Sequence, residues 1–258
     1  MPKIYLVDAF SHGPFTGNPA GVCPLEGAAP EAWMQNVAME MNQAETAFCW
    51  PEGEGYRLRW FTPTAEVELC GHATLATAHV LGNPGQTTFY TKSGFLFARS
   101  EGGKITLDFP SEVAQSATIE MPLDGAVWTG KNRMDWVAVL KSEKAVRDFQ
   151  PDFEAIKSLG QRGLIVTAPG EEDSVDFVSR FFAPAVGVYE DPVTGSAHCC
   201  LCPLWAERLG KKEMRGYQAS LRGGSVDVVL KGDRVELIGF AVTTLEGNLS
   251  QVASPPHS

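Results

Sequence analysis

The stretch FTPTAEVELCGHATLATAHVLG, residues 61–82, has a counterpart in FAPAVGVYEDPVTGSAHCCLCPLWAERLG, residues 182–210. Each begins with Phe-x-Pro after a strand-like run, crosses a short acidic loop and enters a small-residue segment that opens a helix. The helices expected over residues 75–81 and 201–209 end at Gly82 and Gly210, and glycine commonly follows a helix C-terminus. The chain therefore contains an internal repeat of strand, loop and helix.

The repeat continues on both sides of these helices. Two alternating strand pairs with Gly-rich turns follow, SGFLFARSEGGKITLDF from residue 93 and GGSVDVVLKGDRVELIGF from residue 223. Upstream, residues 31–41 and 153–159 are both amphipathic-helix candidates. Three positions match at one constant offset: Gly94 with Gly224, Gly102 with Gly232, and Leu107 with Leu237.

This order of elements predicts an α+β protein of two pseudo-symmetric domains, each a sheet around one central helix. The second helix is apolar on most faces at its start, which is typical of a helix surrounded by a sheet. We expect the N-terminal domain to cover residues 1–113 and the C-terminal domain residues 114–258, with the C-terminal segment able to pack back onto the first domain. Residues 112–122 show no strong periodicity and are expected to link the two.

Composition and charge narrow the possible partners. The 258 residues are 44% hydrophobic and 20% charged, with a dispersed net charge of -10, so neither nucleic acid nor an anionic membrane is expected to bind. A small anionic substrate needs only local donors and remains compatible. The first residues lack the pattern of a signal peptide and no run is long enough to span a membrane, so a cytoplasmic protein is expected. The six cysteines show no disulfide or metal-binding spacing.

The two helix starts are candidate anion-binding elements. Gly71 and Ala73 in the first half and Gly195 and Ser196 in the second are small, so backbone N–H groups can approach a ligand closely. A helix N-terminus carries unsatisfied donors and a partial positive charge, which suits a carboxylate. If a pseudo-twofold axis relates the halves, the two starts converge at the domain interface and bind the substrate there.

Glu45 breaks the repeat. It lies in NQAETAF, residues 42–48, where an apolar strand begins, and its counterpart in the second half is about Gly163. A partly buried carboxylate in only one half is a candidate general acid/base, because burial raises its pKa toward neutrality. A glutamate that only borders the strand fits the same spacing equally well.

Three further residues at the helix starts could orient a substrate. His72 opens the first central helix, and Asp191 and Ser196 flank the start of the second. Taken one at a time, an interface histidine, a turn aspartate before Pro192 and a capping serine explain them as well. Taken together on opposed helix starts, they favour a functional site. No nucleotide-binding or serine-hydrolase motif accompanies them.

Five ordered motifs resemble the PhzF-like (phenazine biosynthesis-like) family from end to end. They are VDAFSHGPFTGNPAGV from residue 7, MNQAETAF from 41, FTPTAEVELCGHATLATAHVL from 61, EDPVTGSAHC from 190 and GYQASLRGG from 216. The resemblance implies a diaminopimelate-epimerase-like fold with two barrel-like domains. It also implies a homodimeric, cofactor-free isomerase without a metal, whose best-known member isomerises dihydro-3-hydroxyanthranilate by moving a proton.

The resemblance also assigns roles to residues. It implies that Glu45 shuttles the proton, assisted by Gly71-His72, Asp191 and Ser196. Two-thiol racemases of the same fold carry a cysteine before each helix start, whereas this chain has Cys70 before the first and Thr194 before the second. One thiol cannot supply both the acid and the base that inversion requires. A cysteine-assisted racemase or epimerase and a non-catalytic ligand-binding protein remain the alternatives, and the substrate itself does not follow from the sequence.

Overall fold

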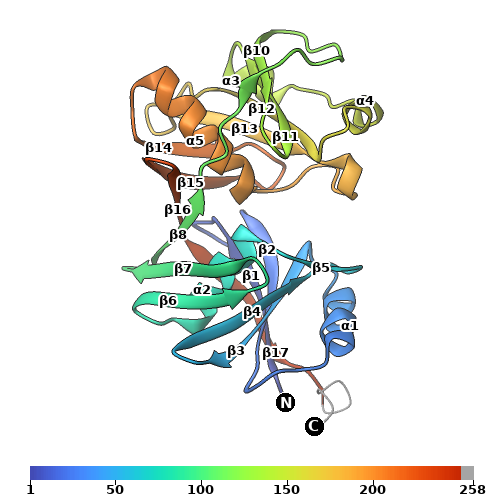
Figure 1. Cartoon of the computed structure of the whole chain (residues 1–258), viewed down its shortest axis with the longest axis vertical. Helices are drawn as coiled ribbons and strands as arrows, with labels where there is room; N and C mark the ends of the chain where they lie inside the picture. The colour runs from blue at the N-terminus through green and yellow to red at the C-terminus, as the bar shows by residue number, and fades with distance from the viewer. Residues whose placement is uncertain (251–258) are drawn as a thin grey trace. The chain divides into compact units, whose positions relative to one another are not determined.

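A computed structural model of the chain describes residues 1–250 and divides it into two compact units (Figure 1). Unit 1 comprises Met1–Asp108 together with the chain from Ile238 onward, and unit 2 is Phe109–Leu237. The chain therefore crosses from one unit to the other within strand β8, Lys104–Pro110, and again within strand β16, Arg234–Gly239. Within residues 1–250, no helix combines the length and apolarity needed to cross a bilayer.

Unit 1 is built from strands that follow one another through hairpins and parallel crossovers. β1 pairs antiparallel with both β2 and β17, β2 pairs parallel with β3, and β3 pairs antiparallel with β4. β4 then pairs antiparallel with β5 and parallel with β6, and β6, β7 and β8 form an antiparallel meander. The strands not yet delimited are β1 Lys3–Ala9, β2 Asn18–Pro24, β3 Glu45–Glu52, β4 Gly55–Phe61, β5 Glu66–Val67, β6 Gly85–Thr91, β7 Gly94–Glu101 and β17 Ala241–Asn248.

The central helix of unit 1 is α2, Gly71–Leu81. It packs against β1, β2, β3, β7 and β17, and every side chain from His72 to Ala78 is buried. A helix that is buried on all faces needs strands around it, so the expected central helix is confirmed. The other helix, α1 at Glu31–Met41, coincides with the predicted amphipathic segment. Its buried face, including Met34 and Ala38, packs with Phe48 in an apolar cluster of unit 1.

Unit 2 repeats this element order. β10 pairs antiparallel with β9 and β11, β11 pairs parallel with β12, β12 antiparallel with β13, β13 parallel with β14, and β14 antiparallel with β15. Its elements are β9 Gln115–Ser116, β10 Ala126–Lys131, β11 Asp135–Leu140, α3 Glu143–Arg147, α4 Phe153–Ser158, β12 Gly163–Pro169, β13 Phe177–Phe182, the 3₁₀ turn η1 Pro184–Val186, α5 Gly195–Leu209, β14 Glu213–Gln218 and β15 Gly224–Lys231.

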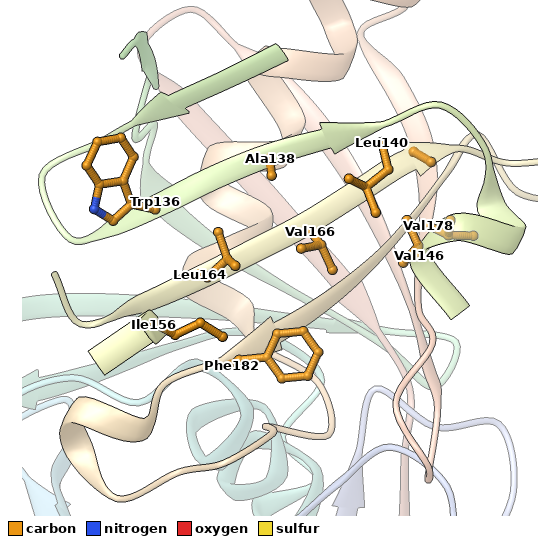
Figure 2. Packing of buried hydrophobic residues seen from close by; sticks show 10 residues of the cluster. Trp136, Ala138, Leu140, Val146, Ile156, Leu164, Val166, Val178 and Phe182 are labelled. Atoms are coloured by element: carbon orange, nitrogen blue, oxygen red, sulfur yellow. The ribbon is translucent and has the colours of Figure 1, made fainter. Parts of the chain in front are cut away.

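The core of unit 2 lies between the strands β11, β12, β13 and the short helices α3 and α4. Figure 2 shows Leu140, Leu164 and Phe182 from the strands meeting Val146 of α3 and Ile156 of α4. Alternate strand residues point into this cluster, and the intervening residues of β11 and β12 are buried as well, so these two strands are covered on both faces. The central helix α5 packs against β14 and β15, so the second expected central helix is confirmed as well.

The turns of the repeat match only in part. Gly102 and Gly232 both have positive φ, at 57° and 65°, and lie at equivalent turns, between β7 and β8 and between β15 and β16. At the preceding turn Gly94 has φ 101°, whereas the positive φ in the other unit belongs to Gly223 rather than Gly224. The predicted alignment of Gly94 with Gly224 nevertheless holds for the strands, because each opens an eight-residue strand, β7 and β15. Within each turn, glycine is required only at the residue that adopts the left-handed conformation, which is Gly94 in unit 1 and Gly223 in unit 2.

Two predicted boundaries need correction. The division at residue 113/114 lies five residues beyond the observed one. The C-terminal domain, expected to run to residue 258, ends at Leu237. The described chain after it belongs to unit 1, where β17 pairs with β1 apart from one irregularity near Leu6, in line with the expectation that the C-terminal segment can pack back onto the first domain. Main-chain pairing between the two ends of the chain has no signature in local sequence, so the periodicity could not reveal it.

The expected linker, residues 112–122, belongs to unit 2. It contains β9, and Ala117, Ile119 and Met121 pack against the core of that unit. Its start also completes helix α5: Pro203 has no N–H for the carbonyl of Cys199, and the backbone N–H of Glu112 donates to that carbonyl at 3.1 Å instead. The segment therefore has a structural role that its weak periodicity did not indicate.

Candidate active site

Glu45 and His72 meet in unit 1. Glu45 is the first residue of β3, and His72 is the second residue of α2. Oε2 of Glu45 lies 3.3 Å from Nε2 of His72, with side-chain exposures of 21% and 9% respectively. The carboxylate thus retains contact with solvent while the imidazole is buried behind it. This is the arrangement of a reachable acid/base group supported by a fixed neighbour.

The imidazole of His72 is neutral at physiological pH. Burial lowers its pKa to about 4. On the side away from Glu45, Nδ1 faces the Asn18 amide nitrogen at 3.3 Å and the Cys70 sulfur at 3.5 Å. Both neighbours can donate a hydrogen to Nδ1, which places the ring proton on Nε2, toward Glu45. In that tautomer the neutral imidazole turns its N–H toward the carboxylate across the 3.3 Å contact.

The chain leading to Asn18 is conformationally unusual. Phe10 is fully buried yet has φ 57°, and Phe15 has φ 70°, both uncommon for bulky side chains. Gly17 has φ 70°, and a Cβ at that position would lie 2.2 Å from the carbonyl oxygen of Ala9, so only glycine fits. Strained backbone persists where the surrounding structure holds it, often at functional sites. Here it delivers Asn18 to the imidazole.

Cys70 is the N-cap residue of α2, with an extended backbone. Its side chain contacts both nitrogens of His72, at 3.5 Å from Nδ1 and 4.0 Å from Nε2. All six cysteines are free thiols and buried. Burial alone raises the pKa of the Cys23 thiol to about 12, and it is the main cause of the same rise in Cys49. Cys70 differs from those two because its sulfur contacts the His72 imidazole and lies within 4.8 Å of a Glu45 carboxylate oxygen.

In unit 2, Asp191 is fixed at the start of α5. The hydroxyl of Thr194, the N-cap residue of α5, donates to Oδ2 of Asp191 at 2.5 Å. Gln218, fully buried on β14, donates to the Asp191 carbonyl at 2.7 Å and accepts from the Thr194 backbone N–H at 2.9 Å. The side chain of Gln218 therefore holds the acidic loop against the helix start. Asp191 and Ser196 consequently share one local framework, as expected.

An arginine that the sequence did not single out reaches Ser196. Arg162 donates from Nη2 to the Ser196 hydroxyl oxygen at 2.9 Å. The same guanidinium binds the fully buried Asp135 through two hydrogen bonds, at 2.9 Å and 2.5 Å. Because the oxygen of Ser196 already accepts from a cation, its own proton is directed to another acceptor. This makes Ser196 a polarised donor suited to an anion.

The two units carry side chains of opposite charge near the equivalent helix starts. Glu45 opens β3, and Gly163 opens β12, so the predicted alignment of these two residues is confirmed. Unit 1 has a carboxylate beside His72, whereas unit 2 has the guanidinium of Arg162 beside Ser196. The fold is duplicated, but the chemistry is not.

The predicted site residues fall into two sets. Glu45 and His72, with Gly71 and Ala73 in the first turn of α2, belong to unit 1. Asp191, Gly195 and Ser196 belong to unit 2. The convergence of both sets on one substrate stays a prediction. Sequence reasoning did not single out three residues that contact the candidate site residues: Asn18, Arg162 and Gln218.

The comparisons with known proteins bear on this arrangement. A family model described as phenazine biosynthesis-like protein matches residues 7–124 and again residues 115–247. The chain belongs to the phenazine biosynthesis-like family. An uncharacterized isomerase of Halalkalibacterium halodurans is 49% identical over 95% of this chain and 97% of its own length. Together these findings identify the chain as an isomerase of that family.

Solved structures agree with the family assignment. A phenazine biosynthesis protein of the PhzF family from Enterococcus faecalis superposes with a TM-score of 0.90 at 43% identity, covering 95% of this chain and 98% of that one. A protein named as a predicted epimerase from Pseudomonas aeruginosa gives a TM-score of 0.72 at 20% identity over 96% and 99% of the two chains. The second likeness shows the fold alone, and that fold is the epimerase-like one the sequence predicted.

The two buried histidines predict acid sensitivity. Burial lowers the pKa of both His72 and His198 to about 4, whereas an unfolded histidine titrates near ~6.5. Between these values the unfolded chain binds protons that the native chain excludes, so the free energy of unfolding falls as pH decreases. We expect urea denaturation to show a loss of about 2–3 kcal/mol per histidine between about pH 7 and pH 4.5.

The variant His198→Asn measures how much of the acid-induced loss of stability comes from His198 alone. Nδ1 of His198 lies 2.8 Å from the carbonyl oxygen of Thr194, and an asparagine amide can supply a donor near the same place. His198→Asn should therefore lose less stability than the native protein on acidification. An equal loss in both proteins would show that His198 is not the group that titrates.

Proposed function

We propose that the protein moves a proton on a small carboxylate-bearing substrate, with Glu45 as the residue that removes and returns it. The observation that carries this proposal is the contact between Glu45 Oε2 and the Nε2 of a neutral His72. A neutral imidazole beside the carboxylate does not lock Glu45 in an ion pair. Glu45 is thus available as a base and, once protonated, as an acid.

The reaction can be balanced with Glu45 alone. The carboxylate takes a proton from a carbon activated by a neighbouring unsaturated group, and the released electron pair shifts the double bond. The protonated Glu45 then returns the proton to a different carbon on the same face, and the double bond settles in its new position. No atom or electron is gained or lost overall. Because unit 2 has Gly163 in the equivalent place, one residue must perform both steps.

We propose that unit 2 supplies binding rather than proton transfer. Ser196 receives a hydrogen bond from the Arg162 guanidinium, which leaves the serine O–H to donate to an anionic group of the substrate. The first turn of α5, beginning at Gly195, adds backbone N–H donors and the positive end of the helix dipole. Asp191 orients a polar group of the substrate from its fixed position beside Thr194.

One observation favours a second candidate, a cysteine-assisted racemase or epimerase. Cys70 Sγ lies 3.5 Å from His72 Nδ1, so a thiol proton could pass to the imidazole. The other half has Thr194 at the equivalent N-cap position and offers no second thiol there. In this second candidate Cys70 would exchange protons with the substrate, and Cys70→Ser would abolish the reaction.

A crystal soaked with small aromatic and cyclohexadiene carboxylates tests the proposal against a non-catalytic binding role. We expect a carbon that bears a removable proton to lie within reach of the Glu45 carboxylate. A ligand bound with Glu45 turned away from it would instead favour a binding protein of the same fold.

Assembly and location are part of the same proposal. We propose a homodimer that acts in the cytoplasm on a small anionic substrate, with no nucleic-acid or membrane partner. Light scattering of the purified protein tests the dimer directly. A monomer at micromolar concentration would contradict it.

A further inference from the structure

Glu45, Cys70 and His72 gather three different metal-ligating groups at one point of unit 1. One carboxylate oxygen, the thiol sulfur and an imidazole nitrogen all lie within 4.8 Å of one another. We propose that these three side chains form a binding site for a borderline-soft divalent cation, Zn²⁺ above all, that competes with the substrate. The site is distinct from a resident cofactor, since the proposed proton transfer uses the same groups without a metal.

The spacing is close to that of a zinc site. Measured from His72 Nε2, the Glu45 oxygen lies at 3.3 Å and the Cys70 sulfur at 4.0 Å. Ligands of a tetrahedral zinc with bonds of about 2.0–2.3 Å lie about 3.3–3.7 Å apart. The Cys70 sulfur now lies nearer Nδ1, at 3.5 Å, so rotation of this side chain about its Cα–Cβ bond must carry the sulfur toward the Nε2 side of the ring. The three ligand atoms already lie within 4.8 Å of one another. Three protein ligands leave the fourth position of the ion for water.

The surroundings supply the support that a metal-bound histidine needs. Coordination through Nε2 places the ring proton on Nδ1, where it needs an acceptor. Asn18 already lies against Nδ1 at 3.3 Å, and turning its amide over presents the carbonyl oxygen in place of the nitrogen. The helix start and strand β3 fix the other two ligands.

The donor set selects the ion. Thiolate and imidazole ligands favour Zn²⁺, Co²⁺ and Cd²⁺, whereas Mg²⁺ and Ca²⁺ require oxygen ligands in larger numbers. A bound zinc occupies the Glu45 oxygen and the His72 nitrogen together. If the proposed function is correct, zinc must therefore inhibit the isomerisation, and substrate must weaken zinc binding. The binding itself does not depend on that function.

Cobalt titration of chelator-treated protein without a polyhistidine tag tests the site, because a Co²⁺–thiolate bond gives a charge-transfer absorption. We expect saturation at one ion per chain and displacement by Zn²⁺. Cys70→Ser should abolish the charge-transfer band, and Glu45→Gln should weaken binding by about tenfold or more, in line with the loss of a ligand. Cys23→Ala, which changes a fully buried thiol on β2 of the same unit, should bind cobalt as the native protein does.

The outcomes separate the two proposals. Absence of stoichiometric binding, or a charge-transfer band that survives Cys70→Ser, overturns the metal site. Thermal melting without metal checks that Cys70→Ser is folded, so a lost band cannot be attributed to unfolding. Stoichiometric binding together with full turnover by Glu45→Gln would uphold the metal site and contradict the glutamate mechanism.

Discussion

Replacing Glu45 with glutamine is expected to lower turnover by about 10²-fold or more, the size typical of a general acid/base contribution. The amide keeps the shape of the side chain and can still face His72, but it cannot take and return a proton. Binding of a carboxylate ligand should persist, since that role is assigned to the helix starts. Steady-state kinetics and a ligand-binding titration on the same preparation separate the two effects.

Cys70→Ser is the matched control for that variant. It changes a side chain that touches the same imidazole, at 3.5 Å from Nδ1, and serine can still donate to that nitrogen. We expect a much smaller loss of turnover than in Glu45→Gln. The reverse order, with Glu45→Gln active and Cys70→Ser inactive, would transfer the chemistry to the thiol.

Arg162→Met is expected to destabilise unit 2 by about 3 kcal/mol, because it leaves the buried carboxylate of Asp135 without its counter-ion. Asp135 is fully buried and receives both hydrogen bonds of the guanidinium. Burial already raises the pKa of this carboxyl, so removal of the arginine should drive it to take up a proton. Urea denaturation measures the loss, which should be smaller at low pH where protonation is easier.

Two comparison variants make the Arg162 prediction specific. Arg215 forms a similar bidentate contact with Asp227, but those side chains are 45% and 26% exposed, so Arg215→Met should cost less than about 1 kcal/mol. Adding Asp135→Asn to Arg162→Met removes the orphaned charge and should restore part of the stability. A loss in Arg162→Met no larger than in Arg215→Met would show that the buried pair does not stabilise the unit.

The sequence predicted those parts of the fold that depend on local features, such as helix ends and the spacing of apolar residues. Glycine C-caps and apolar periodicity located α1, α2 and α5, and the repeat of these signals showed that the fold is duplicated. Local patterns could not predict which strands pair when they are far apart in the sequence. The register of β17 on β1 joins residues from opposite ends of the chain, and the linker could be recognised as part of unit 2 only through its packing and its bond to Cys199.

The candidate site shows the same limit. Glu45 stood out because it departs from its counterpart in the other half, and His72 because it opens the first central helix. The structure brings the two side chains into contact. Arg162 also departs from its counterpart, Ala44, but a single arginine directly before a strand carries no local pattern that marks it as functional. Only three-dimensional contact with Asp135 and Ser196 reveals its role. A comparison of charge at every equivalent position of the two halves would have found it.

Solvent deuterium incorporation tests the central claim, that Glu45 carries the proton. The native protein, Glu45→Gln and Cys70→Ser are incubated in D₂O with small cyclohexadiene and aromatic carboxylates, and deuterium entering substrate and product is followed by NMR. We predict incorporation with the native protein, incorporation at a modestly reduced rate with Cys70→Ser, and a loss of about 10²-fold or more with Glu45→Gln. Incorporation at the native rate by Glu45→Gln, together with none by Cys70→Ser, would contradict the glutamate mechanism.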